Sequence, residues 1–295
     1  MTGRAPDHRP ARPAWAAALA AAAVTCMLAG CMSRAPAGHA SPAAARLPSG
    51  QAAWLLTRSA LAQVITDPAV RAGLGRSEVY EILQPGQQPL PGVDATPVVT
   101  FPAVAALGDA LAGGRLPAGT RAVLYDPEAW SLTPPDEQRD PVRAAARAAE
   151  LAHAHGLKII VAPALNLATV LGPAGPAPRW QRFLDLQLAG RIAKVADIVE
   201  LQAQSLERSP AAYAAFVRQA AGQARSARPG LTVLAGLSTN PPGSAVVSQQ
   251  LAAAVRASWP GVDGYWLNIP GPGPRCPSCN PARPDVGIEA LRAVL

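Results

Sequence analysis

The chain has 295 residues, of which 49% are hydrophobic and 15% charged, and its formal net charge is +7. This length suffices for one large domain with a full hydrophobic core, and the composition excludes a collagen, a coiled coil, an acidic disordered chain and a polytopic membrane protein. The basic residues are mostly single arginines with no run of basic and aromatic residues, so the charge does not indicate nucleic-acid binding.

Residues 1–30 have the organisation of a secretory signal. Three arginines precede an apolar stretch over residues 15–28, and small residues follow it. The segment 15–30 has 16 residues, fewer than the roughly 20 that a membrane-spanning helix needs. We therefore predict a signal peptide over residues 1–30 and export of the remaining chain.

The signal ends in Leu28-Ala29-Gly30-Cys31, which resembles a bacterial lipobox. In lipoproteins with this motif the cysteine becomes the first mature residue and is diacylated. The resemblance therefore implies a lipid anchor on Cys31 and a location at the extracellular face of the cell membrane. An ordinary signal peptide with a chance cysteine is the alternative. Residues 31–50 are rich in Pro, Ala, Ser and Gly, and we predict a disordered tether there.

Residues 51–295 are predicted to form one domain in which strands and helices alternate. A helical stretch is expected over residues 51–65. The predicted strands are short apolar runs at residues 79–83, 97–101, 122–126, 158–162, 197–204, 231–237 and 262–269. The other predicted helices lie at residues 104–111, 142–155, 180–195, 211–227, 244–259 and 288–295. This order indicates βαβ units and a parallel sheet.

Seven strands in a domain of about 245 residues match a (β/α)8 barrel in which one strand is irregular or missing. An open, doubly wound sheet is the alternative. No Gly-x-Gly-x-x-Gly turn follows a predicted strand, so a dinucleotide-binding form of that sheet is disfavoured.

Two cysteines remain in the predicted domain, Cys276 and Cys279, because Cys26 leaves with the signal and Cys31 is lipidated. In an oxidising extracellular setting they predict a local disulfide, with a zinc site or a redox site as alternatives. Zinc needs about four ligands. The domain's two histidines, His153 and His155, lie at a predicted helix C-terminus, where a cation suits the helix dipole.

Polar residues gather at the predicted strand ends. In a barrel, alternate strand residues point inward, and active sites lie at the C-terminal ends of the strands. On the last five predicted strands, residues of one parity begin apolar and become polar. The polar and nearby aromatic residues are Asp126, Glu128, Trp130, Asn166, Glu200, Gln202, Gln204, Asn240, Trp266 and Asn268. This set contains no His or Cys, which argues against Ser-His-Asp or Cys-His acyl chemistry and a His-rich metal site. We predict no metal and no cofactor.

Carboxylates, amides and aromatic rings suit carbohydrate, because amides bind sugar hydroxyls, flat rings pack on sugar faces and paired carboxylates cleave glycosidic bonds. Four strand-end segments carry a resemblance: Tyr125-Asp126-Pro127-Glu128-x-Trp130, Glu200-Leu201-Gln202-Ala203-Gln204, Gly236-Leu237-Ser238-Thr239-Asn240-Pro241 and Tyr265-Trp266-Leu267-Asn268. Over residues 78–290 the domain resembles extracellular glycoside-hydrolase-like barrels and related lipoproteins of GC-rich, actinobacterial-type bacteria. The resemblance implies an anchored protein that acts on or binds polysaccharide.

For a glycosidase we assign Glu128 as acid/base and Glu200 as the partner carboxylate, with Asp126 as the alternative partner. The amides and both tryptophans named above would bind the substrate. Alternatively, Glu200 is a buried structural carboxylate that is hydrogen-bonded to Gln and Tyr. The alternative for Asp126-Pro127-Glu128 is a loop cap. A second class of function also stays open. Because the sixth and seventh strands end in Asn, the domain is alternatively a non-catalytic barrel that binds glycan or another cell-envelope component.

Overall fold

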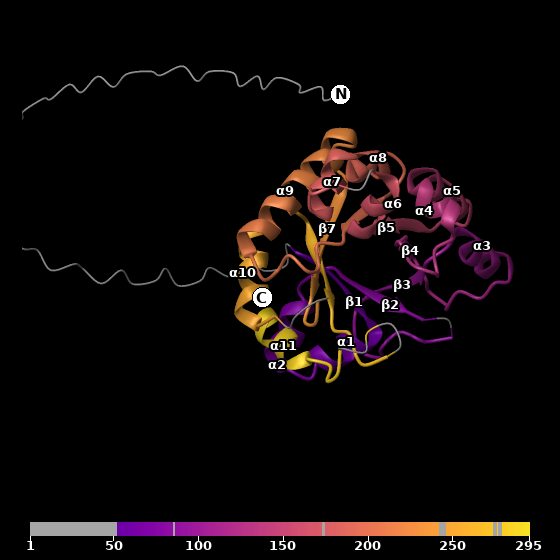
Figure 1. The fold of residues 1–295 in the computed structure, drawn as a ribbon. Coiled ribbons are helices and arrows are strands. Elements are labelled where there is room, and N and C mark those ends of the chain that lie inside the picture. Colours follow the sequence, from indigo (N-terminus) through magenta and orange to yellow (C-terminus); the bar gives the residue numbers. More distant parts are fainter. Residues whose placement is uncertain (1–51, 85, 173–174, 242–245, 274–275, 277–278) are drawn as a thin grey trace, which may run out of the picture. The chain divides into compact units, whose positions relative to one another are not determined.

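Eight parallel strands close into a barrel in the computed structural model, which describes residues 52–84, 86–172, 175–241, 246–273, 276 and 279–295 (Figure 1). The strands pair in chain order. They are β1 (Ala53–Thr57), β2 (Val79–Leu83), β3 (Thr96–Phe101), β4 (Ala122–Tyr125), β5 (Lys158–Val161), β6 (Ile198–Leu201), β7 (Thr232–Ser238) and β8 (Gly264–Asn268). The predicted (β/α)8 barrel is confirmed. The predicted signal, Cys31 and the tether lie outside the described residues.

Helices surround the strands (Figure 1). They are α1 (Arg58–Val64), α2 (Pro68–Leu74), α3 (Val104–Ala112), α4 (Pro135–Arg139), α5 (Pro141–Ala154), α6 (Ala168–Leu171), α7 (Arg179–Asp185), α8 (Leu188–Ala193), α9 (Pro210–Ala227), α10 (Ser248–Ser258) and α11 (Pro284–Arg292), with a short 3-10 turn η1 (Leu165–Leu167). In α2, α5 and α9 a capping Asp or Ser is followed by proline at the first helical position, which fixes where each helix begins. Within the described residues no helix is long and apolar enough to cross a membrane.

The strand missing from the sequence prediction is β1, which lies inside the stretch expected to be helical. Trp54 and Leu56 pack against the helices, whereas Leu55 points into the barrel. A strand buried on both faces shows a continuous apolar run and no alternation, so its sequence does not distinguish it from a helix. β1 closes the barrel against β8, and a side chain at Gly264 would place its Cβ 2.1 Å from the Ala53 carbonyl oxygen.

Two other predicted elements differ from the structure. The helix expected over residues 180–195 is divided into α7 and α8, because Gln187 between them adopts a left-handed conformation with φ of 55°. The strand expected over residues 197–204 ends at Leu201, and Gln202 forms only an isolated bridge with Ala164.

Inward-facing strand residues fill the barrel interior, and on β4 to β8 they are the residues that the sequence pattern directed inward. This inner core consists of Ala53, Leu55, Tyr80, Ile82, Val98, Ala122, Leu124, Ile160, Ala162, Ile198, Leu234 and Trp266. The intervening residues, such as Val199 and Val233, belong to the outer core between strands and helices. The apolar filling separates the C-terminal mouth of the barrel from its N-terminal end, so each end can carry a site of its own.

Candidate functional site

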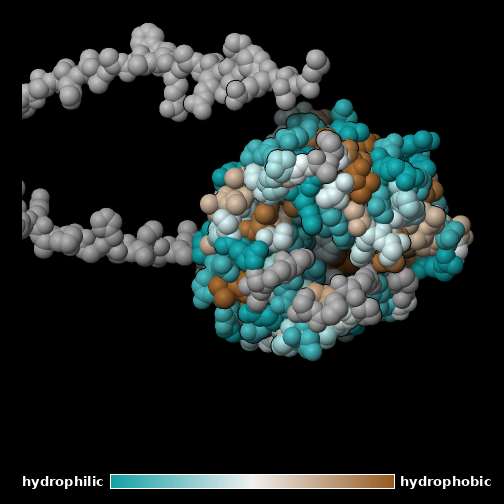
Figure 2. Space-filling view, in the orientation of Figure 1, coloured by the Kyte–Doolittle hydropathy of each residue, from teal (hydrophilic) through white to brown (hydrophobic). Residues whose placement is uncertain are grey.

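The predicted polar residues lie together around the C-terminal mouth of the barrel. Those that are partly exposed there are Asp126, Glu128, Trp130, Asn166, Gln202, Gln204, Asn240 and Asn268. Glu200 and Trp266 lie one layer deeper, with 0% and 8% of their surface exposed. Figure 2 shows a hollow near the centre of the face in view, surrounded mainly by hydrophilic and neutral residues.

Amide side chains from neighbouring strand ends hold the two carboxylates that follow β4. The Gln202 amide nitrogen donates to Asp126 Oδ1 at 2.5 Å and to the Ala162 carbonyl oxygen at 2.9 Å. The Asn166 amide nitrogen donates to Glu128 Oε2 at 3.4 Å, while its Oδ1 accepts the Ala129 N–H at 2.8 Å. The nitrogens of both amides are therefore directed at carboxylates, and they orient Asp126 and Glu128 at the mouth.

The loop that carries Glu128 and Trp130 is fixed by two residues that the sequence pattern did not identify. The buried Thr133 hydroxyl accepts the Glu128 N–H at 3.1 Å and the Trp130 indole N–H at 2.9 Å, and donates to the Pro102 carbonyl at 2.9 Å. Gln138 donates to the carbonyl oxygens of Trp130 and Thr133, both at 2.7 Å. The indole is thus held at its nitrogen.

A cavity of about 400 Å³ adjoins these residues on the β3 side of the mouth. Its lining includes Asp126, Trp130, Leu132, Gln84, Thr100 and Arg115. This volume lies within the range of pockets that hold small ligands, roughly 300–1,000 Å³. The sequence analysis missed Gln84 and Thr100, because β2 and β3 do not show the change from apolar to polar residues that marks the later strands.

Glu200 is sealed beneath the mouth. Neither of its carboxyl oxygens has a hydrogen-bond partner among the described residues, and its side chain has no exposed surface. Burial, followed by the negative charges of Asp126 and Glu128, raises the pKa of Glu200 well above its usual range and so favours its protonated form. The hydrogen bonds to Gln and Tyr considered for this residue are not formed. Glu200 and Glu128 therefore do not face each other across an open cleft.

The amides that follow β6 and β7 are held in different ways. Gln204 lies directly over Gly236, where a Cβ atom would come within 2.4 Å of the Gln204 amide nitrogen. The Asn240 amide nitrogen donates to the Pro281 carbonyl at 3.3 Å, towards the C-terminal segment of the chain. Gln204 thus depends on a glycine opposite it to stay at the mouth.

Three other buried glutamates, Glu81, Glu137 and Glu207, contrast with Glu200 because each accepts hydrogen bonds from backbone N–H groups. Glu137 accepts from Val104, the first residue of α3, at 3.1 and 3.2 Å. Glu207 accepts from Ser205 at 2.6 Å and from Ser238 at 2.8 Å. Burial raises the pKa of Glu207 to about 7. No sequence pattern marked these residues, and the contacts of Glu137 with Val104 and of Glu207 with Ser238 join segments that are distant along the chain.

Cys276 and Cys279 are joined by a disulfide, which confirms the local pairing predicted from their spacing. Among the residues that the structure describes, no group of three or more His, Cys, Asp or Glu side chains is placed to hold a metal ion.

Comparisons with known proteins place the fold among known barrels. No family model and no curated protein sequence matches the chain. A putative alpha-L-fucosidase from Bacteroides thetaiotaomicron is 8% identical, with a TM-score of 0.50, over 88% of this chain and 98% of its own. A chitinase from Chromobacterium violaceum is 13% identical (TM-score 0.46; 82% and 98% covered), and triosephosphate isomerase from Bartonella henselae is 12% identical (TM-score 0.40; 74% and 92% covered). At 8% identity the likeness to the fucosidase structure establishes the barrel fold alone.

Proposed function

We propose that this protein is a glycoside-hydrolase-like barrel that acts on polysaccharide at its C-terminal mouth, and that it is held at the extracellular face of the cell membrane by a lipid on Cys31. One observation carries the proposal. Two partly exposed carboxylates, Asp126 and Glu128, follow one strand and are each oriented by an amide from another strand end. Asp126 also lines a cavity together with the Trp130 indole ring.

The proposed chemistry needs an acid and a carboxylate at the scissile bond. In glycoside hydrolysis one carboxylic acid protonates the leaving oxygen, and a second carboxylate acts as nucleophile or activates water. We assign the acid to Glu128, whose side chain is partly exposed at the mouth and lies 3.4 Å from the Asn166 amide nitrogen. Asp126 becomes the partner carboxylate in place of Glu200, which is sealed. Trp130 supplies an apolar ring for a sugar face.

A second candidate function is non-catalytic binding of a glycan or another envelope component. The burial of Glu200 favours this second function. It leaves Asp126 and Glu128, which both follow β4, as the partly exposed carboxylates, with none on a facing strand among the predicted residues. The amides and the cavity would then serve recognition only.

Measuring binding and hydrolysis together separates the two functions. The full chain, solubilised in detergent, is incubated with a panel of purified polysaccharides, and both retention and release of reducing ends are followed. We expect Glu128→Gln and Asp126→Asn to abolish hydrolysis while binding persists, and the exposed Glu150→Gln control to behave as the wild type. Binding without hydrolysis by the wild type would establish the second function, and no binding to any polysaccharide would refute both. Cys31→Ser should release the protein from the membrane fraction.

A further inference from the structure

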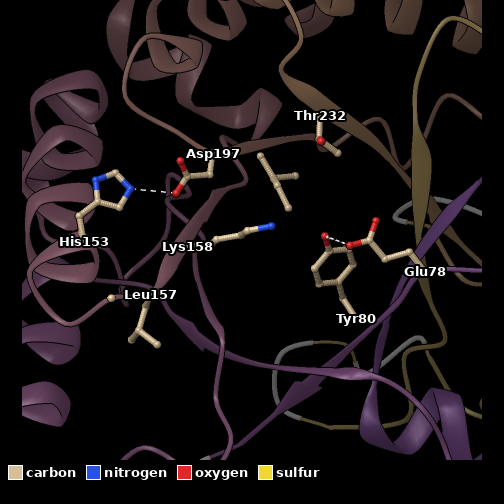
Figure 3. Close-up of a pocket in the computed structure, with 9 residues that line it drawn as sticks. Glu78, Tyr80, His153, Leu157, Lys158, Asp197 and Thr232 are labelled. Atoms are coloured by element: carbon tan, nitrogen blue, oxygen red, sulfur yellow. Dashed lines mark hydrogen bonds and ion pairs between the residues drawn. The ribbon is translucent and has the colours of Figure 1, made fainter.

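A second cavity, of about 500 Å³, opens at the N-terminal end of the barrel, opposite the mouth that carries Asp126 and Glu128 (Figure 3). Its walls come from the beginnings of four strands and from the C-terminal end of α5. The lining residues used below are Glu78, Tyr80, His153, Lys158, Asp197 and Thr232. The apolar inner core of the barrel lies between this cavity and the mouth.

Most polar groups in the wall of this cavity are paired with each other. The Tyr80 hydroxyl donates to Glu78 Oε1 at 2.6 Å. His153 Nε2 lies 2.8 Å from Asp197 Oδ2, which also accepts the Ile159 N–H at 2.9 Å. Tyr80 is 3% exposed, so this wall is anchored in the barrel. These pairs shape the cavity and leave few groups to bind a ligand.

Lys158 is different, because its ammonium group forms no hydrogen bond or ion pair with a described residue. Figure 3 shows the ammonium directed into the space between Asp197 and the Tyr80–Glu78 pair. Two further groups around the cavity also form no hydrogen bond with a described residue. They are the Thr232 hydroxyl and the second carboxylate oxygen of Glu78. The cavity thus presents one cation, one hydroxyl and one acceptor from the beginnings of different strands.

We propose that this cavity binds a small hydroxylated organic acid. Its carboxylate would pair with the Lys158 ammonium, and its hydroxyls would bond to Thr232 and to the open oxygen of Glu78. The negative charges of Glu78 and Asp197 disfavour a second negative charge on the ligand, so a monoanion with neutral donors fits better than inorganic phosphate or a dicarboxylate. A neutral sugar would bring no charge to pair with the Lys158 ammonium.

Isothermal titration of the full chain in detergent tests this proposal, with D-glucuronate as the hydroxylated acid, D-glucose as its neutral analogue and inorganic phosphate as the plain anion. We expect saturable binding of glucuronate, and affinities at least tenfold weaker for glucose and phosphate. Lys158→Met should weaken glucuronate binding at least tenfold, and Thr232→Val should weaken it to a smaller extent. The chain offers a matched control in Lys194→Met, which changes its only other lysine, an exposed residue that follows α8.

The outcomes are separable from those at the mouth of the barrel. Glucuronate binding should persist in the Asp126→Asn/Glu128→Gln double variant, whatever that variant does to polysaccharide. The proposal is overturned if the acid does not bind, if glucose binds equally well, if folded Lys158→Met retains full affinity, or if binding is lost in the double variant.

Discussion

Glu207 should make the stability of this barrel depend on pH, and Glu207→Gln isolates that dependence. The carboxylate has no exposed surface, and it holds the loop after β6 to the end of β7 through the N–H groups of Ser205 and Ser238. Its pKa is raised by burial from an ordinary 4.5 to about 7. Gln has nearly the same shape but does not titrate, so the comparison removes the proton equilibrium.

The contribution of Glu207 to stability depends on pH because proton binding is linked to folding. A raised pKa means that the folded protein binds this proton more tightly than the unfolded chain does. Protonated Glu207 therefore stabilises the fold fully below about pH 4.5, and this contribution is lost as the pH rises through about 7. One pKa unit corresponds to about 1.36 kcal/mol, so the contribution is about 3 kcal/mol.

Urea denaturation of wild type and Glu207→Gln at pH 4.5 and pH 8 measures this contribution. We expect the difference in free energy of unfolding between wild type and variant to be about 3 kcal/mol larger at pH 4.5 than at pH 8. Glu150→Gln, which changes an exposed carboxylate, controls for the titration of other groups and should show no such difference. Equal differences for Glu207→Gln at the two pH values would refute the reasoning.

Two further predictions concern the mouth of the barrel. Gly236→Ala should displace the Gln204 amide, which lies 2.4 Å from the position of the new Cβ, and weaken polysaccharide binding in a retention assay while the circular dichroism spectrum is preserved. Unchanged retention would show that Gln204 does not contact the ligand. Glu200→Met should raise the free energy of unfolding at pH 7 by about 1–3 kcal/mol, because it removes a buried carboxyl without a partner. A lower free energy of unfolding for Glu200→Met than for the wild type, measured by urea denaturation at pH 7, would contradict this prediction.

The parts of the fold that could be predicted are those with a local signal. From β4 onward the inward residues change from apolar to polar along each strand, and this alternation correctly placed Asp126, Asn166 and Gln202 at one end of the barrel. β1 could not be recognised because both of its faces are buried, which removes the alternation.

The features of the site that the sequence does not reveal depend on contacts between distant segments. Glu207 reaches Ser238 across 31 residues, and Glu137 reaches Val104 across 33. The depth of Glu200 is set by how many layers of side chains lie above it, and strand parity indicates only that it points inward. Because the sequence does not reveal this depth, it could not show whether Glu200 and Glu128 face each other across an open cleft.

The start of β1 has a consequence for where the protein would work. Ala53 pairs with Gly264 at the N-terminal end of the barrel, so residues 1–52 join the domain at the end opposite Asp126 and Glu128. A lipid on Cys31 would leave residues 32–52 as a leash of at most about 70 Å at full extension. The polypeptide therefore enters the barrel at the end that carries the Lys158 cavity, and the mouth with Asp126 and Glu128 lies at the other end.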